Sequence, residues 1–223
     1  MNSSLNHSTL LKIDILSDVV CPWCVIGYKR LQKAIQELQL EDKVCIEWHP
    51  FELNPQMSPE GENLRSHLAA KYGTTLEGSI AARKHLTELG AELGFRFNYF
   101  DEMRMYNTRK AHLLIHLAKE KGLQTVMSEA LFEAYFSNQK DISDTEELVK
   151  VAVQVGFNEA EVCYVLNDRS LTEMLQSLQG KWLSNDFNGV PAFIFNYGVT
   201  LTGAQEINTF KSVLTRVIAE ELV

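Results

Sequence analysis

The sequence lacks a basic cluster, a long apolar run and a glycine-rich nucleotide loop, and each absence argues against a class of function. No Lys/Arg-rich run occurs in its 223 residues, and the formal net charge is -8, so we expect no nucleic-acid partner. No stretch approaches the roughly 20 apolar residues that a membrane span needs, so no membrane partner is expected. No G-x-G-x-x-G is present, so a bound nicotinamide cofactor is not expected either.

The N-terminal segment has few features of a secretory signal. Its first basic residue is Lys12, and Lys12, Asp14 and Asp18 interrupt the apolar residues. This favours a cytoplasmic protein, in which the four cysteines would not form structural disulfides. A chain of this length can bury a sufficient core without them.

Strand and helix patterns alternate around a C-x-x-C motif near the N-terminus. Apolar residues alternate with polar ones over 11–16 and again over 44–50, which predicts two short strands. Between them, Cys21-Pro22-Trp23-Cys24 precedes a segment with helical periodicity. Pro22 suits the first turn of that helix, where its missing N–H would have no partner.

The middle of the chain, residues 58–177, has helical periodicity almost throughout. Asp144 and Asn158 are each followed three residues later by glutamate, a pattern typical of helix starts. Strand patterns return at 191–195 and 199–201, with turn residues at 196–198 between them, and a last helix opens at 202–205. We therefore expect an all-helical segment within an otherwise α/β chain.

The C-x-x-C motif predicts thiol chemistry. Free N–H groups and the helix dipole at the start of a helix favour the thiolate form of Cys21. Cys21, exposed at the helix end, would attack a disulfide, and Cys24, one turn further, would resolve the mixed disulfide.

Metal binding and simple packing are the alternatives for these residues. A C-x-x-C can be half of a zinc site, but Cys45 and Cys163 each stand alone and provide no second pair. His112 and His116 have the spacing of a metal pair but lack a recognisable third ligand. We therefore expect no metal, and we expect Cys45 and Cys163 to be buried core residues.

Several segments resemble DsbA-like thioredoxin-fold proteins of the FrnE type, in order along nearly the whole chain. The matching segments are 18–27 (DVVCPWCVIG), 48–55 (WHPFELNP), 107–112 (NTRKAH), 134–136, 141–143, 189–191 (GVP) and 201–205 (LTGAQ). The resemblance implies an α/β, thioredoxin-like fold with an inserted all-helical domain. Residues 1–57 and 178–223 would form the thioredoxin-like domain, and 58–177 the inserted helical domain.

The resemblance also implies roles for residues outside the motif. The Val190–Pro191 bond would be cis and lie beside the sulfurs, and the backbone of Val190 would pair with an extended substrate. The alternative is that Pro191 merely starts an edge strand. The expected catalytic residues are Cys21 and Cys24, and the expected substrate-binding residues are Pro22, Trp23, Val190, Pro191, Asn107 and His112.

Two residues near these segments have less specific expected roles. Gly27 would let the helix that follows the motif pack closely on the sheet. Glu52 would either relay protons to Cys24 or pin the loop that carries it. For His112, a packed or surface position is the alternative to a place in the cleft.

The leading functional prediction is a cytoplasmic thiol–disulfide oxidoreductase or isomerase without a bound cofactor. Its partners would be disulfide-containing protein or peptide clients, with glutathione or a thioredoxin-type protein as reductant. The alternative is a glutathione-dependent enzyme related to 2-hydroxychromene-2-carboxylate isomerases and kappa-class glutathione transferases. Those typically carry serine where this chain has Cys21, although N–H groups at 203–205 could hold a glutathione carboxylate.

A third hypothesis is non-enzymatic. A redox-sensing or holdase module would expose apolar surface in one redox state and would show no turnover. Phe51, Tyr99, Phe100 and Tyr106 could supply such a patch, but aromatic residues at this density are more often core.

Overall fold

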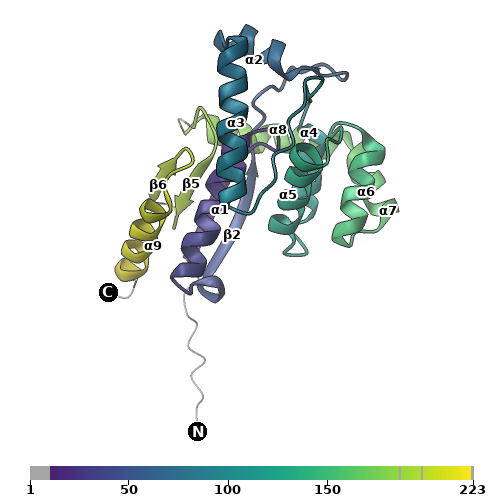
Figure 1. Ribbon diagram of the computed structural model, residues 1–223. Coiled ribbons are helices and arrows are strands. Elements are labelled where there is room, and N and C mark those ends of the chain that lie inside the picture. Colours follow the sequence, from purple (N-terminus) through teal and green to yellow (C-terminus); the bar gives the residue numbers. More distant parts are fainter. Residues whose placement is uncertain (1–10, 186, 197, 222–223) are drawn as a thin grey trace.

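The computed structural model describes residues 11–185, 187–196 and 198–221. Its main sheet contains four strands in the order β2-β1-β5-β6 (Figure 1). These are β1 (Leu11–Ser17), β2 (Val44–Pro50), β5 (Ala192–Phe195) and β6 (Val199–Thr202). β1 is parallel to β2 and antiparallel to β5, and β5 and β6 form the predicted hairpin. Tyr197 of the predicted turn and residues 1–10 of the predicted first domain lie outside the described part.

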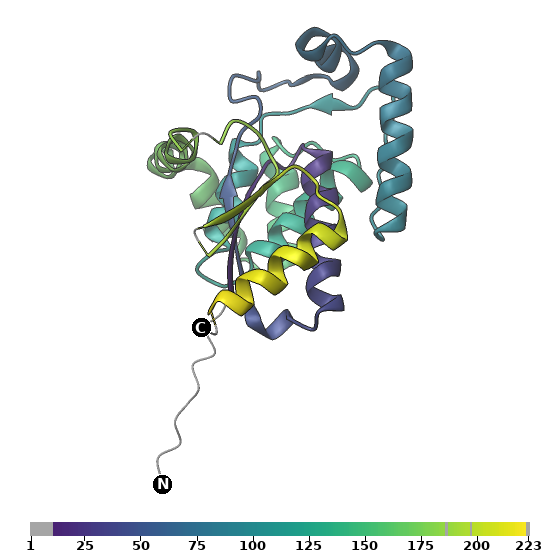
Figure 2. The same ribbon diagram turned by 90° about the vertical axis from the view of Figure 1, so that its left-hand side faces the viewer.

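Helices cover both faces of this sheet (Figure 2). α1 (Pro22–Glu37) and α9 (Ile207–Glu221) contact each other on one face, where the rings of Phe193 and Phe210 lie 4.9 Å apart. On the other face, Leu16 and Ile194 pack with Trp182 of α8 (Arg169–Leu183). Side chains alternate along a strand, so neighbouring residues of β1 point to different helical layers.

Gly27 has the predicted packing role. A Cβ atom at this position would lie 3.0 Å from Cζ of Phe193 and 3.2 Å from Cγ of Pro191. Because glycine has no side chain, α1 can lie directly against β5 and the residue that precedes it. This close approach brings the start of α1 next to Pro191.

The segment between β2 and β5 is mostly helical. Its helices before α8 are α2 (Leu64–Tyr72), α3 (Leu76–Glu92), α4 (Arg109–Leu117), α5 (Gln124–Phe132), α6 (Thr145–Val155) and α7 (Glu159–Asn167). Asp144 and Asn158 cap α6 and α7 as predicted, since each side chain accepts backbone N–H groups of the first turn. None of the helices in the described ranges is both long and apolar enough to cross a membrane.

This segment is not purely helical, contrary to expectation. β3 (Glu62–Asn63) and β4 (Arg104–Met105) form a second, two-stranded antiparallel sheet. Strands of two residues are too short to produce an alternating pattern in the sequence. The predicted boundary between residues 177 and 178 falls inside α8, and the division into two domains stays a prediction.

The helices of this segment lie in two places. α2 and α3 extend beyond the end of the sheet where α1 begins, whereas α4 and α5 lie beside β2 and α6 and α7 pack against them on the outer side (Figure 1). α3 approaches the C-x-x-C turn, because the rings of His85 and Trp23 lie 6.3 Å apart. The start of α1 is therefore flanked by α3 on one side.

The expectation that Cys45 and Cys163 belong to the core is wrong. Cys45 is exposed on β2, which is an edge strand, and Cys163 on α7 is partly exposed. Cys45 shares one face of β2 with Glu47 and His49, so its neighbours along the strand are polar.

Candidate active site

Cys21 is the N-cap residue of α1. Its backbone is extended (φ -91°, ψ 109°), and Pro22 occupies the first helical position, as predicted. The N–H of Cys21 donates to the Asp18 carbonyl at 3.0 Å, and the N–H of Cys24 donates to the Cys21 carbonyl at 3.0 Å. No acidic residue lies in the first turn of α1, so the partial positive charge of the helix end is not offset there.

Cys24 lies beneath Cys21 and is almost inaccessible. Cys24 is 1% exposed and Cys21 is 5% exposed, so both cysteines are buried and the expectation that Cys21 is exposed at the helix end is wrong. Burial raises the pKa of the Cys24 thiol well above its usual range, and the neighbouring Cys21 sulfur raises this pKa further. Cys24 is therefore a neutral thiol near pH 7, held next to Cys21.

The turn before β5 completes this arrangement. The Val190–Pro191 peptide bond is cis, as the resemblance implied. The Cys21 Sγ lies 3.8 Å from the Val190 carbonyl oxygen. The Pro191 carbonyl accepts the N–H of Gly203 at 2.8 Å, which ties this turn to the end of β6.

A cavity of about 370 Å³ opens between the C-x-x-C turn and helices α2 and α3. Of the residues expected at the site, Cys21, Pro22, Trp23 and Val190 line it. Trp23 is 42% exposed, so its ring is accessible from the cavity side. Pro191 instead borders a smaller groove of about 270 Å³, and Val190 lines both hollows.

Asn107 and His112 do not line this cavity in the described structure. The Asn107 side chain accepts the N–H of Arg109 at 3.0 Å at the start of α4. His112 is 3% exposed, and its Nε2 lies 3.3 Å from Oδ1 of Asp18. In the structure both side chains make contacts within the protein. That Asn107 and His112 contact substrate stays a prediction.

Asp18 was not singled out by the sequence patterns as a site residue. It is fully buried, and its Oδ2 accepts the N–H of Leu53 at 2.7 Å. Glu52, in the same loop, accepts a hydrogen bond from Nε of Arg109 at 3.1 Å. These contacts favour the second expected role of Glu52, in which it pins the loop that forms one wall of the cavity.

Ser79, Arg83 and Tyr99 also line the cavity and were not predicted to contact substrate. They belong to α3 and to the chain between α3 and β4, far from the C-x-x-C in the sequence. Helical periodicity in this region indicates which residues form a helix, but not which element that helix will face.

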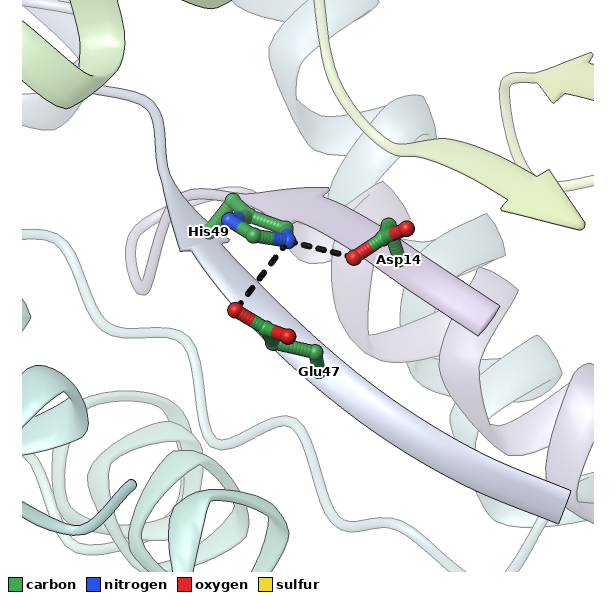
Figure 3. Close-up of side chains that lie close together, drawn as sticks. All are labelled: Asp14, Glu47 and His49. Carbon is green, nitrogen blue, oxygen red and sulfur yellow. Dashed lines mark hydrogen bonds and ion pairs between the residues drawn. The ribbon is translucent and has the colours of Figure 1, made fainter. Parts of the chain in front are cut away.

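A group of possible metal ligands lies on the other face of the sheet. The donor atoms of Asp14, Glu47 and His49 lie within 4.8 Å of one another (Figure 3). The Lys12 ammonium lies 2.9 Å from Asp14 and 3.0 Å from Glu47, and Lys119 also bonds Glu47. Lysine ammonium groups thus already supply positive charge to both carboxylates.

The same network determines the ionisation of Asp14. Burial alone would raise the pKa of this carboxyl, but hydrogen bonds from His49 and Lys12 outweigh burial and hold the pKa below its usual value. Asp14 and His49 share the α8 face, where the His49 ring lies 4.8 Å from that of Trp182. The cluster is therefore separated from Cys24, which lies on the α1 side of the sheet.

The sheet order, with the C-x-x-C at the start of the helix after β1, defines a thioredoxin-like fold with a helical insertion. Residues 12–215 match the model of the DSBA-like thioredoxin domain. The chain belongs to this family, which confirms the predicted fold class and the family-level resemblance.

Individual relatives agree with this assignment. The crystal structure of the probable DsbA oxidoreductase SCO1869 from Streptomyces coelicolor is similar, with a TM-score of 0.88, 29% identity, and coverage of 94% of this chain and 91% of that one. YwbO of Bacillus subtilis is 26% identical over 204 residues, covering 91% of this chain and 95% of that protein. The cytosolic disulfide reductase DsbM from Pseudomonas aeruginosa with GSH shares the fold, with a TM-score of 0.64, 16% identity and coverage of 92% and 98%.

Proposed function

We propose that this protein is a cytoplasmic thiol–disulfide oxidoreductase or isomerase of the FrnE type, with Cys21 as nucleophile and Cys24 as resolving thiol. The observation that carries the proposal is the position of Cys21. Cys21 is the N-cap residue of α1 and lines the cavity, its sulfur lies 3.8 Å from the Val190 carbonyl oxygen, and the neighbouring Cys24 is buried.

The reaction proceeds by two exchanges. The Cys21 thiolate attacks one sulfur of a substrate disulfide, the substrate S–S bond breaks, and one substrate thiolate leaves and takes up a proton. Cys24 then loses its proton and attacks the Cys21 sulfur, which forms the Cys21–Cys24 disulfide and releases the second substrate thiol. The substrate gains two electrons and two protons from the dithiol. Glutathione or a thioredoxin-type protein then reduces the Cys21–Cys24 disulfide with two further electrons and is itself oxidised to a disulfide.

The environment of Cys24 supports this division of roles. Because burial raises its pKa, Cys24 stays protonated and does not compete with Cys21 for the first attack. Cys24 reacts only after a mixed disulfide has formed beside it. A glutathione transferase would need no resolving thiol, so the buried pair favours the dithiol mechanism over that alternative.

Protein or peptide clients would bind at Val190. Its backbone borders both the cavity beside Cys21 and the groove along the turn to Gly203. An extended peptide can add to such an edge by backbone hydrogen bonds, which would bring its disulfide to Cys21. Trp23 would contact the peptide from the other side.

The test is a redox titration of the purified protein in glutathione buffers, with thiols trapped by alkylation and read by intact mass. We expect a reversible Cys21–Cys24 disulfide with a two-electron midpoint. Cys21→Ser should abolish reductase turnover, and Cys24→Ser should accumulate mixed disulfides with clients. Cys45→Ser, which removes an exposed cysteine on β2, serves as the matched control and should behave as the wild type.

Two results would overturn the proposal. A stable single glutathione adduct, with no internal disulfide at any ratio of reduced to oxidised glutathione, would favour a glutathione-dependent enzyme. Full dithiol turnover by Cys24→Ser would remove the resolving role of Cys24.

A further inference from the structure

Three residues that line the same cavity as Cys21 carry buried polar atoms without a partner. These atoms are the Ser79 hydroxyl, the Tyr99 hydroxyl, and Nε and Nη2 of Arg83, all of which lack hydrogen bonds within the described structure. Ser79 is 3% exposed. Buried polar groups are normally paired in folded proteins, so a cluster of unpaired ones beside a cavity indicates a ligand.

The guanidinium of Arg83 has little to balance its charge. Its Nη1 donates to the Phe100 carbonyl at 3.0 Å, and its nearest carboxylate, that of Asp101, is 4.0 Å away and mostly exposed to solvent. The Arg83 side chain is only 12% exposed, and burial lowers its pKa. The guanidinium lies 5.6 Å from the centre of the Tyr99 ring, so Arg83 and Tyr99 form a cation–π pair.

The lining of the cavity has the opposite sign to the chain as a whole. The protein has a formal net charge of -8, yet Arg83 and Lys71 line the cavity and none of the described lining residues is Asp or Glu. Lys71 is held by the Leu53 carbonyl at 3.0 Å and by Asn54 at 2.7 Å. Lys71 is exposed and keeps one free N–H, whereas Arg83 has both Nε and Nη2 unpaired and buried, so Arg83 offers a ligand the larger set of donors.

We propose that this cavity binds the carboxylate of a low-molecular-weight disulfide, with Arg83 as the anion-binding residue and Tyr99 and Ser79 as additional donors. The fork of the guanidinium matches a carboxylate in geometry and charge. A volume of about 370 Å³ lies at the small end of the range of pockets that hold small molecules.

This inference rests on the proposed function, because Cys21 lines the same cavity and would receive the sulfur of the bound disulfide. The reaction is the same two-step thiol–disulfide exchange. One disulfide oxidises the Cys21–Cys24 dithiol and leaves as two thiols, each of which carries one proton. In the experiment below, the reduced protein is itself the reductant.

The experiment compares three symmetric disulfides in single turnovers of the pre-reduced protein. They are 3,3′-dithiodipropionate with two carboxylates, bis(2-hydroxyethyl) disulfide without charge, and cystamine with two ammonium groups. The second-order rate constant of protein oxidation is measured by acid quench and intact mass. Each value is divided by the rate constant of the same disulfide with dithiothreitol, which corrects for intrinsic reactivity.

We expect the normalised rate constant for dithiodipropionate to exceed that for the uncharged disulfide by about tenfold, as a charge-assisted contact allows. Cystamine should be the slowest. Arg83→Gln should bring the ratio of the first two close to one. Tyr99→Phe, which removes only an unbonded hydroxyl, should lower the ratio by about threefold.

Lys84→Gln is the matched control. Lys84 follows Arg83 in α3, its side chain is 77% exposed, and it does not line the cavity. The substitution removes the same charge from the same helix and should leave the ratio unchanged. If Arg83→Gln fails to fold, the ratio of rate constants is compared between Tyr99→Phe and the wild type instead. Calorimetric binding of dithiodipropionate to Cys21→Ala, with and without Arg83→Gln, gives a readout that needs no thiol exchange.

The outcomes separate this inference from the proposed function. Equal normalised rates for all three disulfides, unaffected by Arg83→Gln, would refute the carboxylate site and leave the dithiol function intact. Oxidation of the reduced protein by none of them would refute the dithiol function itself. If the Arg83 dependence appeared only with disulfide peptides that carry acidic side chains, the assignment to a small molecule would be wrong.

Discussion

The Cys21 sulfur lies 3.8 Å from the carbonyl oxygen of Val190, although 169 residues separate them in the chain. The β1–α1 turn supplies one residue, and the chain that enters β5 supplies the other. What joins them is the packing of α1 against β5, which depends on Gly27. The geometry of the reactive cysteine is therefore set in part by a residue that carries no side chain.

Gly27→Ala should destabilise the protein. The added Cβ would lie 3.0 Å from the Phe193 ring and 3.2 Å from the Pro191 ring, both buried, so α1 and these side chains must move apart by a few tenths of an ångström. Overpacking of this kind costs about 1–3 kcal/mol. We expect a lower denaturation midpoint and a slower reaction of Cys21 with small disulfides, because the same shift moves α1 relative to Val190.

Gly180→Ala is the control for Gly27→Ala. Gly180 lies in α8, and nothing lies within 4 Å of a Cβ built there. Alanine should stabilise this helix by up to about 1 kcal/mol, through helix propensity alone. If both alanine variants changed stability by the same amount and in the same direction, close packing at Gly27 would not be the reason for its glycine.

Asp18→Ala should loosen the loop that walls the cavity. The Asp18 carboxylate accepts the Leu53 N–H at 2.7 Å and lies 3.3 Å from His112, and its removal leaves both without an acceptor. A buried donor without a partner costs about 1–3 kcal/mol, and Asp18→Asn, which keeps one oxygen, should cost less. Urea denaturation measures both variants, with exposed Asp42→Ala as control. Equal stability of the wild type and Asp18→Ala would show that the carboxylate does not hold this loop.

The side chain of Gln124, on α5, links the helical segment to β2 through hydrogen bonds to the backbone of Trp48. Its side-chain oxygen accepts the Trp48 N–H at 3.1 Å, and its amide donates to the Trp48 carbonyl at 3.1 Å, as a neighbouring strand would. Gln124→Leu should therefore leave two buried backbone groups unpaired and cost about 2–5 kcal/mol.

The measurement is again the free energy of unfolding, compared with that of Gln154→Leu. Gln154 is exposed on α6, so its replacement should change stability by less than about 0.5 kcal/mol. A loss in Gln124→Leu no larger than in Gln154→Leu would mean that water replaces the amide at the edge of β2.

The sequence predicted the strands of the main sheet, including the C-terminal hairpin, and the C-x-x-C helix, because each produces a local signal. Pro22 and the alternation in 11–16 act within a few residues, and so do the caps Asp144 and Asn158. The Val190–Pro191 turn was placed beside the cysteines by resemblance alone, because no local pattern relates segments so far apart.

The rest of the site depends on contacts that periodicity does not encode. Arg83 and Tyr99 reach the cavity because α3 lies next to the C-x-x-C turn. Ile80 fits the helical period of α3 but is 54% exposed, because this helix projects and is covered on one side only. Cys45 resembled a core residue because the sequence does not show that its strand lies at the edge of the sheet.

The buried thiol of Cys24 predicts how the stability of the reduced protein depends on pH. Burial is the main reason that the pKa of Cys24 is raised in the folded protein, whereas a cysteine in the unfolded chain has a pKa of about 8.5. Above that pH the unfolded chain has lost a proton that the folded protein still binds. The free energy of unfolding therefore falls as pH rises, by at most about 1.4 kcal/mol per pH unit, until Cys24 ionises in the folded state too.

Cys24→Ala removes this contribution and leaves the buried tyrosines, whose raised pKa values affect both proteins alike. Urea denaturation under reducing conditions between about pH 7.5 and 10 should thus show a steeper loss of stability for the wild type than for Cys24→Ala. Cys45→Ala, at an exposed position, should follow the wild-type slope. Parallel slopes for the wild type and Cys24→Ala would mean that the Cys24 thiol ionises in the folded protein as easily as in the unfolded chain. The resolving cysteine could then compete with Cys21 for the first attack on a disulfide.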